Sequence, residues 1–210
     1  AGLIDKKYAG ALAGGIDPAR ATPSTAVAPT RRDAFESRET THFSIMDREG
    51  MAVSNTYTLN FSFGTGIIAA GTGVFLNNEM DDFSAKPGAP NAYDLLGGAA
   101  NAVAPAKRPL SSMTPALISR DGQVMIATGS PGGSRIITTV LQVVMNVIDH
   151  GMDIGSAVRA PRIHHQWWPD RLSLEAEVPA AAAAELHARG HALKTVRPMG
   201  SAQTVMRAPD

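Results

Sequence analysis

Thr40-Thr41-His42-Phe43-Ser44-Ile45-Met46 is the stretch that decides the fold, because regular alternation of apolar and polar residues begins there abruptly. Phe43 and Ile45 alternate with polar neighbours, which is the period of a β-strand. Residues 47–50 supply a turn, and residues 53–60 alternate again. The two segments predict a β-hairpin. One face of its second strand carries only Ser, Thr and Asn, which suits a ligand site better than a solvent-facing surface.

Upstream of this hairpin the pattern is weaker. Residues 3–14 predict a short helix that ends at Gly14-Gly15. Residues 18–39 are rich in Ala, Thr, Pro, Ser and Arg without any period, which predicts a mobile surface linker. The chain starts without Met and without a signal-peptide pattern, so we expect it to be an excerpt of a longer precursor.

Downstream, loops come first and regular elements follow. Glycine-rich or Pro/Gly/Asn-rich loops are expected at residues 64–73 and 86–98. Further elements are predicted as follows: a hairpin of residues 114–120 and 123–130, helices at 136–148, 154–159 and 179–189, strands near 162–166 and 172–175, and a strand shortly before Pro209. Hairpins first and helices later, with no βαβ rhythm, predict a layered α+β domain.

Composition narrows the possible functions. The 210 residues suffice for one sizeable domain, and the 19 basic and 19 acidic residues cancel, so neither a nucleic-acid nor an anionic-membrane partner is indicated. The longest apolar stretches are too short to span a bilayer. Without cysteine, thiol nucleophiles, disulfides and cysteine-bound metals are excluded. GxSxG, HExxH and GxxxxGK[ST] signatures are absent as well, and we expect neither a metal nor a cofactor.

Thr40 is the first candidate for chemistry, because it opens the first core strand directly after the linker. Cleavage between Glu39 and Thr40 would free an α-amino group, whose reference pKa is about 8. Such an amine can accept the proton of the threonine hydroxyl at neutral pH, so one residue would serve as nucleophile and base. On position alone, however, an ordinary strand-opening threonine is the commoner interpretation.

Three other segments are candidates for a site. Residues 130–134 place two glycines between a strand and a helix, which suits an oxyanion hole or a plain turn. Residues 77–83 gather amides and carboxylates, which could bind an ammonium group or a cation, or form a solvated acidic turn. Ser111-Ser112 could bind a carboxylate or cap a turn. We expect His164-His165 and Trp167-Trp168 to pack rather than to react.

Several blocks in order resemble the γ-glutamyltranspeptidase family. The blocks are Thr40–Ser44, Tyr57–Asn60, Phe63–Gly66, Asn77–Phe83, Lys107–Met113, Gly129–Ser134 and Pro161–Gln166. Thr40–Ser44 is similar to the start of the family's mature small subunit. The resemblance covers the chain from Thr40 onward, and residues 4–39 are more weakly similar to the tail of the large subunit.

The resemblance implies an N-terminal-nucleophile (Ntn) hydrolase fold, a four-layer αββα sandwich, of which this chain would hold a part. It divides the chain into residues 1–39, the end of the large subunit and a linker, and residues 40–210, a C-terminally truncated small subunit. It implies self-cleavage at Glu39–Thr40. Thr40 would then take the γ-glutamyl group from glutathione or another γ-glutamyl compound and release it to water or to an acceptor amino acid or peptide.

The same resemblance assigns roles to individual residues. Thr58 would orient the Thr40 hydroxyl, and the backbone N–H groups of Gly132 and Gly133 would form the oxyanion hole. The substrate α-amino group would be held by Asn60, Glu79 and Asp82, its α-carboxylate by Ser111 and Ser112, and Tyr93 would belong to a lid. The remaining large subunit is the implied partner, and the implied location is periplasmic or extracellular.

One departure and two alternatives accompany the resemblance. The family's substrate-binding arginine belongs to the large subunit, and neither Arg108 nor Arg135 is its counterpart by motif. A related acylase acting on another amide, such as a β-lactam side chain, is the nearest enzymatic alternative. An uncleaved or truncated paralogue that serves as a binding or assembly module is the alternative from another class.

Overall fold

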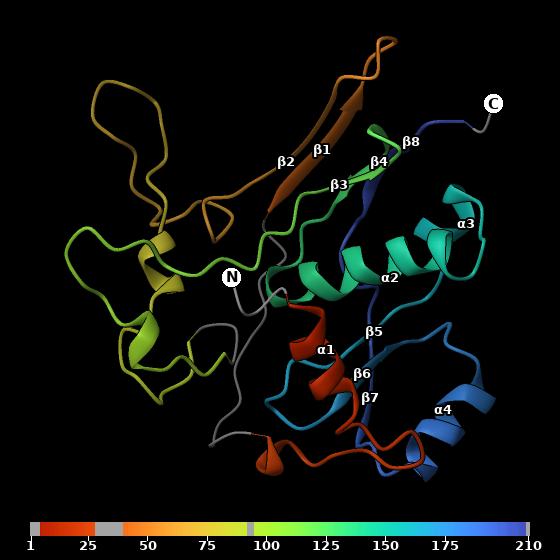
Figure 1. Ribbon diagram of the computed structural model, residues 1–210. Coiled ribbons are helices and arrows are strands. Elements are labelled where there is room, and N and C mark those ends of the chain that lie inside the picture. The colour runs from red at the N-terminus through yellow and green to blue at the C-terminus, as the bar shows by residue number, and fades with distance from the viewer. Residues whose placement is uncertain (1–4, 28–39, 92–94, 209–210) are drawn as a thin grey trace.

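The structure is a computed structural model that describes residues 5–27, 40–91 and 95–208 (Figure 1). Its helices and strands, in chain order, are α1 (Lys6–Ala13), η2 (Ser24–Ala26), β1 (Thr41–Met46), β2 (Ala52–Tyr57), η3 (Glu79–Asp82), η4 (Ala99–Asn101), β3 (Ala116–Arg120), β4 (Gln123–Gly129), η5 (Gly133–Arg135), α2 (Ile136–Ile148), α3 (Ile154–Arg159), β5 (Ile163–His164), β6 (Leu172–Glu175), α4 (Ala180–Ala188), β7 (Leu193–Val196) and β8 (Gln203–Met206). Elements labelled η are short 3₁₀ helices.

The strands form the hairpin β1–β2, the sheet β3-β4-β8 and the sheet β5-β6-β7. The hairpin packs against one face of β3-β4-β8, and α2 covers the other face (Figure 1). This stacking follows from the alternation in β4, because Ala127 and Gly129 offer little bulk to the hairpin while Ile126 faces the helix. The described residues therefore form β, β and α layers, which confirms the predicted layered α+β domain.

Helix α2 spans Ile136–Ile148, as predicted from its periodicity. Its side chains at positions 136, 139, 140 and 143 are buried, which is the i, i+3, i+4, i+7 stripe of an amphipathic helix. Burying each such apolar side chain contributes about 1.5–3 kcal/mol, which outweighs the weak preference of its β-branched residues for strands. Gly151, with φ of +64°, turns the chain back after the helix ends.

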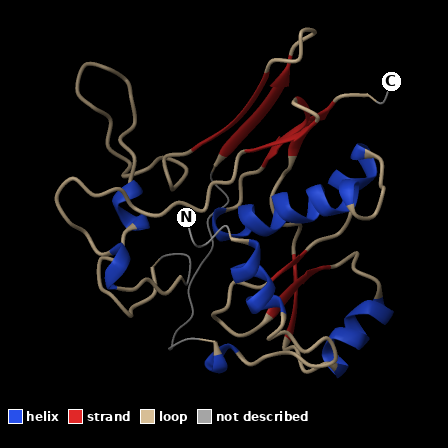
Figure 2. Cartoon of the chain, viewed as in Figure 1, coloured by secondary structure: helices blue, strands red, loops and turns tan. Residues whose placement is uncertain are grey.

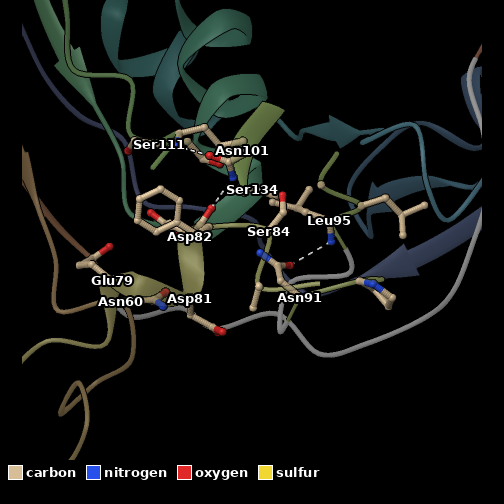
Figure 3. A pocket seen from close by; sticks show the side chains of 18 of the residues that line it. Asn60, Glu79, Asp81, Asp82, Ser84, Asn91, Leu95, Asn101, Ser111 and Ser134 are labelled. Atoms are coloured by element: carbon tan, nitrogen blue, oxygen red, sulfur yellow. Dashed lines mark hydrogen bonds between the residues drawn. The ribbon is translucent and has the colours of Figure 1, made fainter. Parts of the chain in front are cut away.

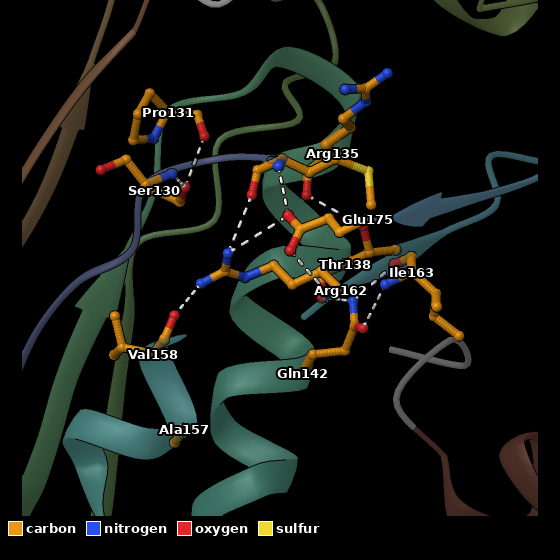
Figure 4. Close-up of polar contacts among 12 residues, drawn as sticks. Ser130, Pro131, Arg135, Thr138, Gln142, Ala157, Val158, Arg162, Ile163 and Glu175 are labelled. Atoms are coloured by element: carbon orange, nitrogen blue, oxygen red, sulfur yellow. Dashed lines mark hydrogen bonds and ion pairs between the residues drawn. The ribbon is translucent and has the colours of Figure 1, made fainter. Parts of the chain in front are cut away.

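A buried ion pair holds the third sheet to the loop before β8 (Figure 4). Arg162 and Glu175 are both buried, with Nη1 of Arg162 3.6 Å from Oε1 of Glu175. The Glu175 carboxylate also accepts from the backbone N–H groups of Arg162 and Met199, and the guanidinium donates to the Val158 carbonyl. Because every charge here meets several hydrogen-bond partners, the pair specifies how β5, β6 and residues 199–200 sit together.

The N-terminal part departs from prediction in two ways. Helix α1 begins at Lys6 because the Asp5 side chain caps it, accepting from the Lys7 N–H at 2.8 Å. Secondly, the described part of the predicted linker, residues 18–27, is attached to the domain at a buried point, since Ser24 is only 3% exposed and its N–H donates to Oδ2 of Asp170 at 2.7 Å. Nε1 of Trp167 in turn donates to the Ser24 carbonyl at 3.0 Å. Residues 28–39 lie outside the described residues.

The other predicted helices and strands are present, some with the predicted bounds and the rest with bounds shifted by at most three residues. Sequence reasoning missed β7. This strand, Leu193–Val196, pairs in parallel with β6 and is only four residues long, with Lys194 and Thr195 both exposed. Such a short segment carries too little alternation to be recognised. His164, for which no chemistry was expected, connects β5 to α2 through a 2.8 Å contact between its Nδ1 and Thr138 Oγ1.

Candidate active site

One cavity collects nearly all the predicted site residues, and much of its wall is loop. Between β2 and β3 the described chain has only the short helices η3 and η4 as named elements, and Figure 2 draws most of this segment as loop. Its residues share the cavity with Thr40, just before β1, and with Ile136 at the start of α2. The cavity encloses about 200 Å³. Predicted residues that line it are Thr40, Thr58, Asn60, Glu79, Asp82, Ser111, Ser112 and Gly133, and further lining residues include Asp81, Ser84, Asn91, Asn101, Met113 and Ser134 (Figure 3).

Thr40 and Thr58 are neighbours across the hairpin. Strand β1 pairs with β2 so that His42 lies opposite Thr56, and extending that register by two residues places Thr40 opposite Thr58 on the same face. Oγ1 of Thr40 donates to Oγ1 of Thr58 at 3.2 Å. The backbone N–H of Asn60 also donates to Oγ1 of Thr58, at 2.9 Å. The hairpin therefore holds the Thr40 hydroxyl in a defined direction at the cavity wall.

The glycine turn before α2 adopts a backbone that side chains disfavour. Gly132 has φ of +136° and Gly133 has φ of +56°. A Cβ atom at Gly132 would lie 3.4 Å from Cα of Gly200. Gly133 lines the cavity together with Thr40 and begins η5, so the chain enters its helical segment at the cavity. Backbone N–H groups at a helix start favour a developing negative charge.

The acidic turn forms a carboxylate pair. Glu79 and Asp82 belong to the single turn η3 and share a side-chain hydrogen bond. Burial, and then the neighbouring Asp82, raise the pKa of Glu79 to about 7. Burial also raises the pKa of Asp82, although the hydrogen bond from Glu79 opposes that shift. Both pKa values are raised, so this pair holds a proton more readily than an isolated carboxyl group does.

Oε1 of Glu79 is buried without a hydrogen-bond partner among the described residues. An unsatisfied carboxyl oxygen in a cavity is costly unless a ligand donates to it. Asn60 lies beside the pair, only 5% exposed and with φ of +72°, and its Nδ2 donates to the Asn78 carbonyl at 3.2 Å. This end of the cavity can therefore receive a donor-rich or cationic group.

Asn101 joins the acidic end of the cavity to the serine segment, and sequence reasoning missed it. Its Nδ2 donates to the Asp82 carbonyl at 2.7 Å, and its Oδ1 accepts from the Leu110 N–H at 3.0 Å (Figure 3). Ser111 is the next residue after Leu110 in the chain, and its Oγ accepts from the Met113 N–H at 3.1 Å. No sequence pattern marks Asn101, since a single asparagine in an Ala-rich loop has many equivalents.

The predicted lid residue Tyr93 lies outside the described residues. Both flanks of its loop do line the cavity, and the Asn91 N–H donates to the Leu95 carbonyl at 3.1 Å. Within the described ranges, His, Asp and Glu side chains form no cluster of three or more that could hold a metal ion. The helices of the described residues include none with the length and apolar character needed to cross a membrane.

Comparison with known proteins gives relatives over the whole chain. The chain is 52% identical over 208 residues to a glutathione hydrolase proenzyme of Escherichia coli. This match covers 99% of this chain and 36% of that protein. Among solved structures, a γ-glutamyltranspeptidase of Helicobacter pylori is 51% identical with a TM-score of 0.78, covering 81% of this chain and 92% of that chain. A cephalosporin acylase of Bacillus halodurans is 29% identical with a TM-score of 0.63, covering 75% and 28% of the two chains.

These likenesses show the Ntn-hydrolase fold, and the β, β and α layers described above are three of its four. The chain spans about a third of the length of the curated relatives that it matches. The sequence pattern of γ-glutamyltranspeptidases extends over residues 1–210, and on this match the chain belongs to the γ-glutamyltranspeptidase family.

Proposed function

We propose that the full-length protein is a γ-glutamyltransferase and glutathione hydrolase that matures by cutting itself between Glu39 and Thr40. Residues 1–39 would then end the large subunit, and residues 40–210 would belong to the small one. The observation that carries this proposal is one cavity holding both the Thr40–Thr58 hydroxyl pair and the Glu79–Asp82 carboxylate pair. A nucleophile beside a site for a cation fits an amide substrate with an ammonium group.

Maturation would use the Thr40 hydroxyl first. Its oxygen adds to the Glu39 carbonyl carbon, and the C–N bond between the two residues breaks. The proton of the Thr40 hydroxyl moves to the nitrogen, which becomes the free α-amine of Thr40. Water then hydrolyses the ester, which leaves a carboxylate on Glu39 and a free hydroxyl on Thr40. Glu39 itself lies outside the described residues.

Turnover would repeat this chemistry on substrate. The α-amine of Thr40 accepts the hydroxyl proton while Oγ1 attacks the γ-carbonyl carbon, and the N–H groups of Gly132 and Gly133 stabilise the oxyanion. The leaving amine takes the proton. Water or an acceptor amine then attacks the γ-glutamyl ester and restores Thr40. The hydrogen bond from Thr40 to Thr58 supports the role of Thr58 in orienting the nucleophile.

The substrate's amino-acid head would lie across the cavity. Asn60, Glu79 and Asp82 would hold the α-ammonium group, for which the unpartnered Oε1 of Glu79 is the best-placed acceptor. Ser111 and Ser112 would donate to the α-carboxylate, which an arginine from the rest of the precursor would complete. The flanks of the Tyr93 loop line this cavity, which supports a lid function for that loop.

Glu79→Gln tests the ammonium contact. In the wild type, kcat/KM for a γ-glutamyl substrate should rise as pH increases through about 7, because the Glu79 carboxyl ionises there. The variant cannot ionise, so it should lose about 10- to 100-fold in kcat/KM at pH 8, since a hydrogen bond to a charged group is worth about 1.5–3 kcal/mol. Its profile should also lose the ionisation near pH 7. A glutaryl substrate, which lacks the ammonium group, is the control and should be insensitive to the change.

The substrate class is tested by comparing three anilides on the purified full-length protein. We expect hydrolysis of γ-glutamyl anilide, with glutaryl and α-glutamyl anilides at least about tenfold slower, because neither presents ammonium and γ-carbonyl together. The likeness to a cephalosporin acylase favours an acylase as the second candidate. Preference for the glutaryl anilide would establish that candidate instead.

The outer face of the hairpin indicates where the rest of the precursor binds. Phe43, Ile45, Val53 and Tyr57 are 41–57% exposed on one face of β1–β2. Contiguous apolar surface of this kind marks an interface. About two thirds of the length of the matched relatives lies beyond this chain, and we infer that the corresponding part of the precursor covers this face.

Ile45→Lys in the full-length precursor should lower the yield of processed, soluble enzyme several-fold, because a lysine there would be buried at the interface. Gel filtration with mass spectrometry measures this yield. Ile45→Leu keeps the apolar surface and should behave as wild type. Equal yields from the lysine and leucine variants would place the interface elsewhere.

A periplasmic or extracellular location remains a prediction from the resemblance, which fractionation of cells producing the full-length protein would test.

A further inference from the structure

His42 lies on the inner face of the hairpin, in the row next to the two threonines. It is 6% exposed, and its cross-strand partner Thr56 is 8% exposed. Nδ1 of His42 is 2.7 Å from Oγ1 of Thr56, and Nε2 is 3.0 Å from Oγ of Ser44. His42 is thus buried between two hydroxyl groups, two residues after the proposed nucleophile Thr40. It has no part in the chemistry proposed above.

The hydrogen bonds decide which nitrogen carries the proton. Oγ of Ser44 donates its own proton to the Gln203 carbonyl at 2.9 Å, so toward His42 it can only accept. Nε2 is therefore the N–H donor, and in the neutral ring Nδ1 accepts from the Thr56 hydroxyl. Burial lowers the pKa of the His42 imidazole, which keeps the ring neutral and preserves this order. The result is a series of three hydrogen bonds that all donate in one direction, from Thr56 to His42, from His42 to Ser44 and from Ser44 to the Gln203 carbonyl of β8.

Gly129 provides the space for the ring. A Cβ atom there would lie 2.1 Å from Cε1 and 2.3 Å from Nδ1 of His42, closer than any side chain could be accommodated. Gly129 ends β4, pairs with Gln203 of β8, and immediately precedes the turn of residues 130–133. The hairpin thus rests on the Gly129–Gln203 pair through His42 and Ser44.

We propose that His42 is a positioning residue, whose ring, seated on Gly129 and held by Thr56 and Ser44, sets the separation between the Thr40 hydroxyl and the N–H groups of Gly132 and Gly133. Thr40 lies two residues before His42, and Gly132 lies three residues after Gly129. His42 is therefore a side chain through which β1, which follows Thr40, contacts β4, which leads into the glycine turn. This inference rests on the proposed function, because that function makes the Thr40 hydroxyl the nucleophile and the glycine N–H groups the oxyanion donors.

The tests use the full-length precursor and two readouts, the rate of self-cleavage and the kcat of the processed enzyme with γ-glutamyl anilide. Thr56→Val keeps the shape but removes the donor to Nδ1, and should lower kcat about tenfold with KM unchanged. Thr56→Ser keeps the hydroxyl and should restore kcat to within about twofold. A raised KM with unchanged kcat in Thr56→Val would contradict the proposal. Equal kcat values for the valine and serine variants would contradict it as well.

A double-variant cycle tests the ring and its seat directly. Gly129→Ala should lower kcat about a hundredfold by displacing the ring, and His42→Ala about tenfold. Because the three atoms nearest to the alanine methyl all belong to the His42 ring, the double variant should have the kcat of His42→Ala alone. Losses that multiply, to about a thousandfold, would show that the two positions act independently and would overturn the proposal.

Failure of the proposed function is recognised separately. A wild type that cleaves itself but leaves γ-glutamyl anilide intact would refute the substrate assignment, and the same variants would then be judged by their self-cleavage rates. A wild type that neither cleaves itself nor hydrolyses the anilide would overturn both proposals.

Discussion

Thr40→Ala in the full-length precursor should leave one uncut chain and abolish hydrolysis of γ-glutamyl anilide, by a factor on the order of 10⁴ or more. The reason is that the Thr40 hydroxyl is proposed as nucleophile both for maturation and for turnover, and the Thr58 hydroxyl that it contacts at 3.2 Å cannot replace it. Intact-mass spectrometry after incubation at neutral pH gives the first result, and the anilide assay gives the second.

Thr41→Ala is the matched control. Thr41 is adjacent in sequence but exposed on the opposite face of β1, so its loss should leave both cleavage and activity near wild type. In the wild type, the smaller product should begin at Thr40. A single uncut chain from wild type and variant alike, without activity, would leave the family's fold but favour a binding or assembly module over an enzyme.

The repetitive parts of the fold could be predicted because periodic burial leaves a periodic sequence. Helix α2 was predicted with its observed bounds, since a stripe of buried residues recurs over 13 positions. The polar face of β2 was recognised for the same reason, and it does point inward, with Thr56 buried and Tyr57 exposed. Inward polar and outward apolar residues reverse the usual pattern of a surface hairpin, which indicates a site on one side and an interface on the other.

The contacts that connect distant segments could not be predicted in this way. Asn101, which bonds to both Asp82 and Leu110, and Ser24, which is bound to Asp170, each act through one hydrogen bond or two, and such contacts impose no period on the sequence. Gly129 is a similar case, because a glycine at a strand end predicts a turn and not a seat for a histidine from another strand. The family resemblance supplied the candidate residues of the cavity, and the structure adds the residues that hold them.

Gly132→Ala should lower kcat of the processed enzyme about 10²- to 10³-fold with little change in KM. Gly132 has φ of +136°, a backbone conformation that residues with a Cβ rarely adopt and that costs them about 1–3 kcal/mol, and the new methyl would also touch Cα of Gly200. The turn should relieve that strain by rotating its peptide units, which moves the proposed oxyanion donors away from the reacting carbonyl. Losing one such donor costs about 10²- to 10³-fold in kcat.

Gly122→Ala separates this effect from backbone strain in general. Gly122 also has positive φ, +78°, but it lies in the turn between β3 and β4 with nothing within 4 Å of a Cβ atom. It should therefore lose about 1 kcal/mol of stability and keep its kcat. Thermal unfolding and steady-state kinetics of both variants give the comparison. If Gly132→Ala lowers the unfolding temperature as Gly122→Ala does yet keeps wild-type kcat, the oxyanion donors are not in this turn. If kcat falls in Gly132→Ala alone, the glycine serves catalysis and not only the fold, since strain is common to both positions and adjacency to Gly133, which lines the cavity with Thr40, is not.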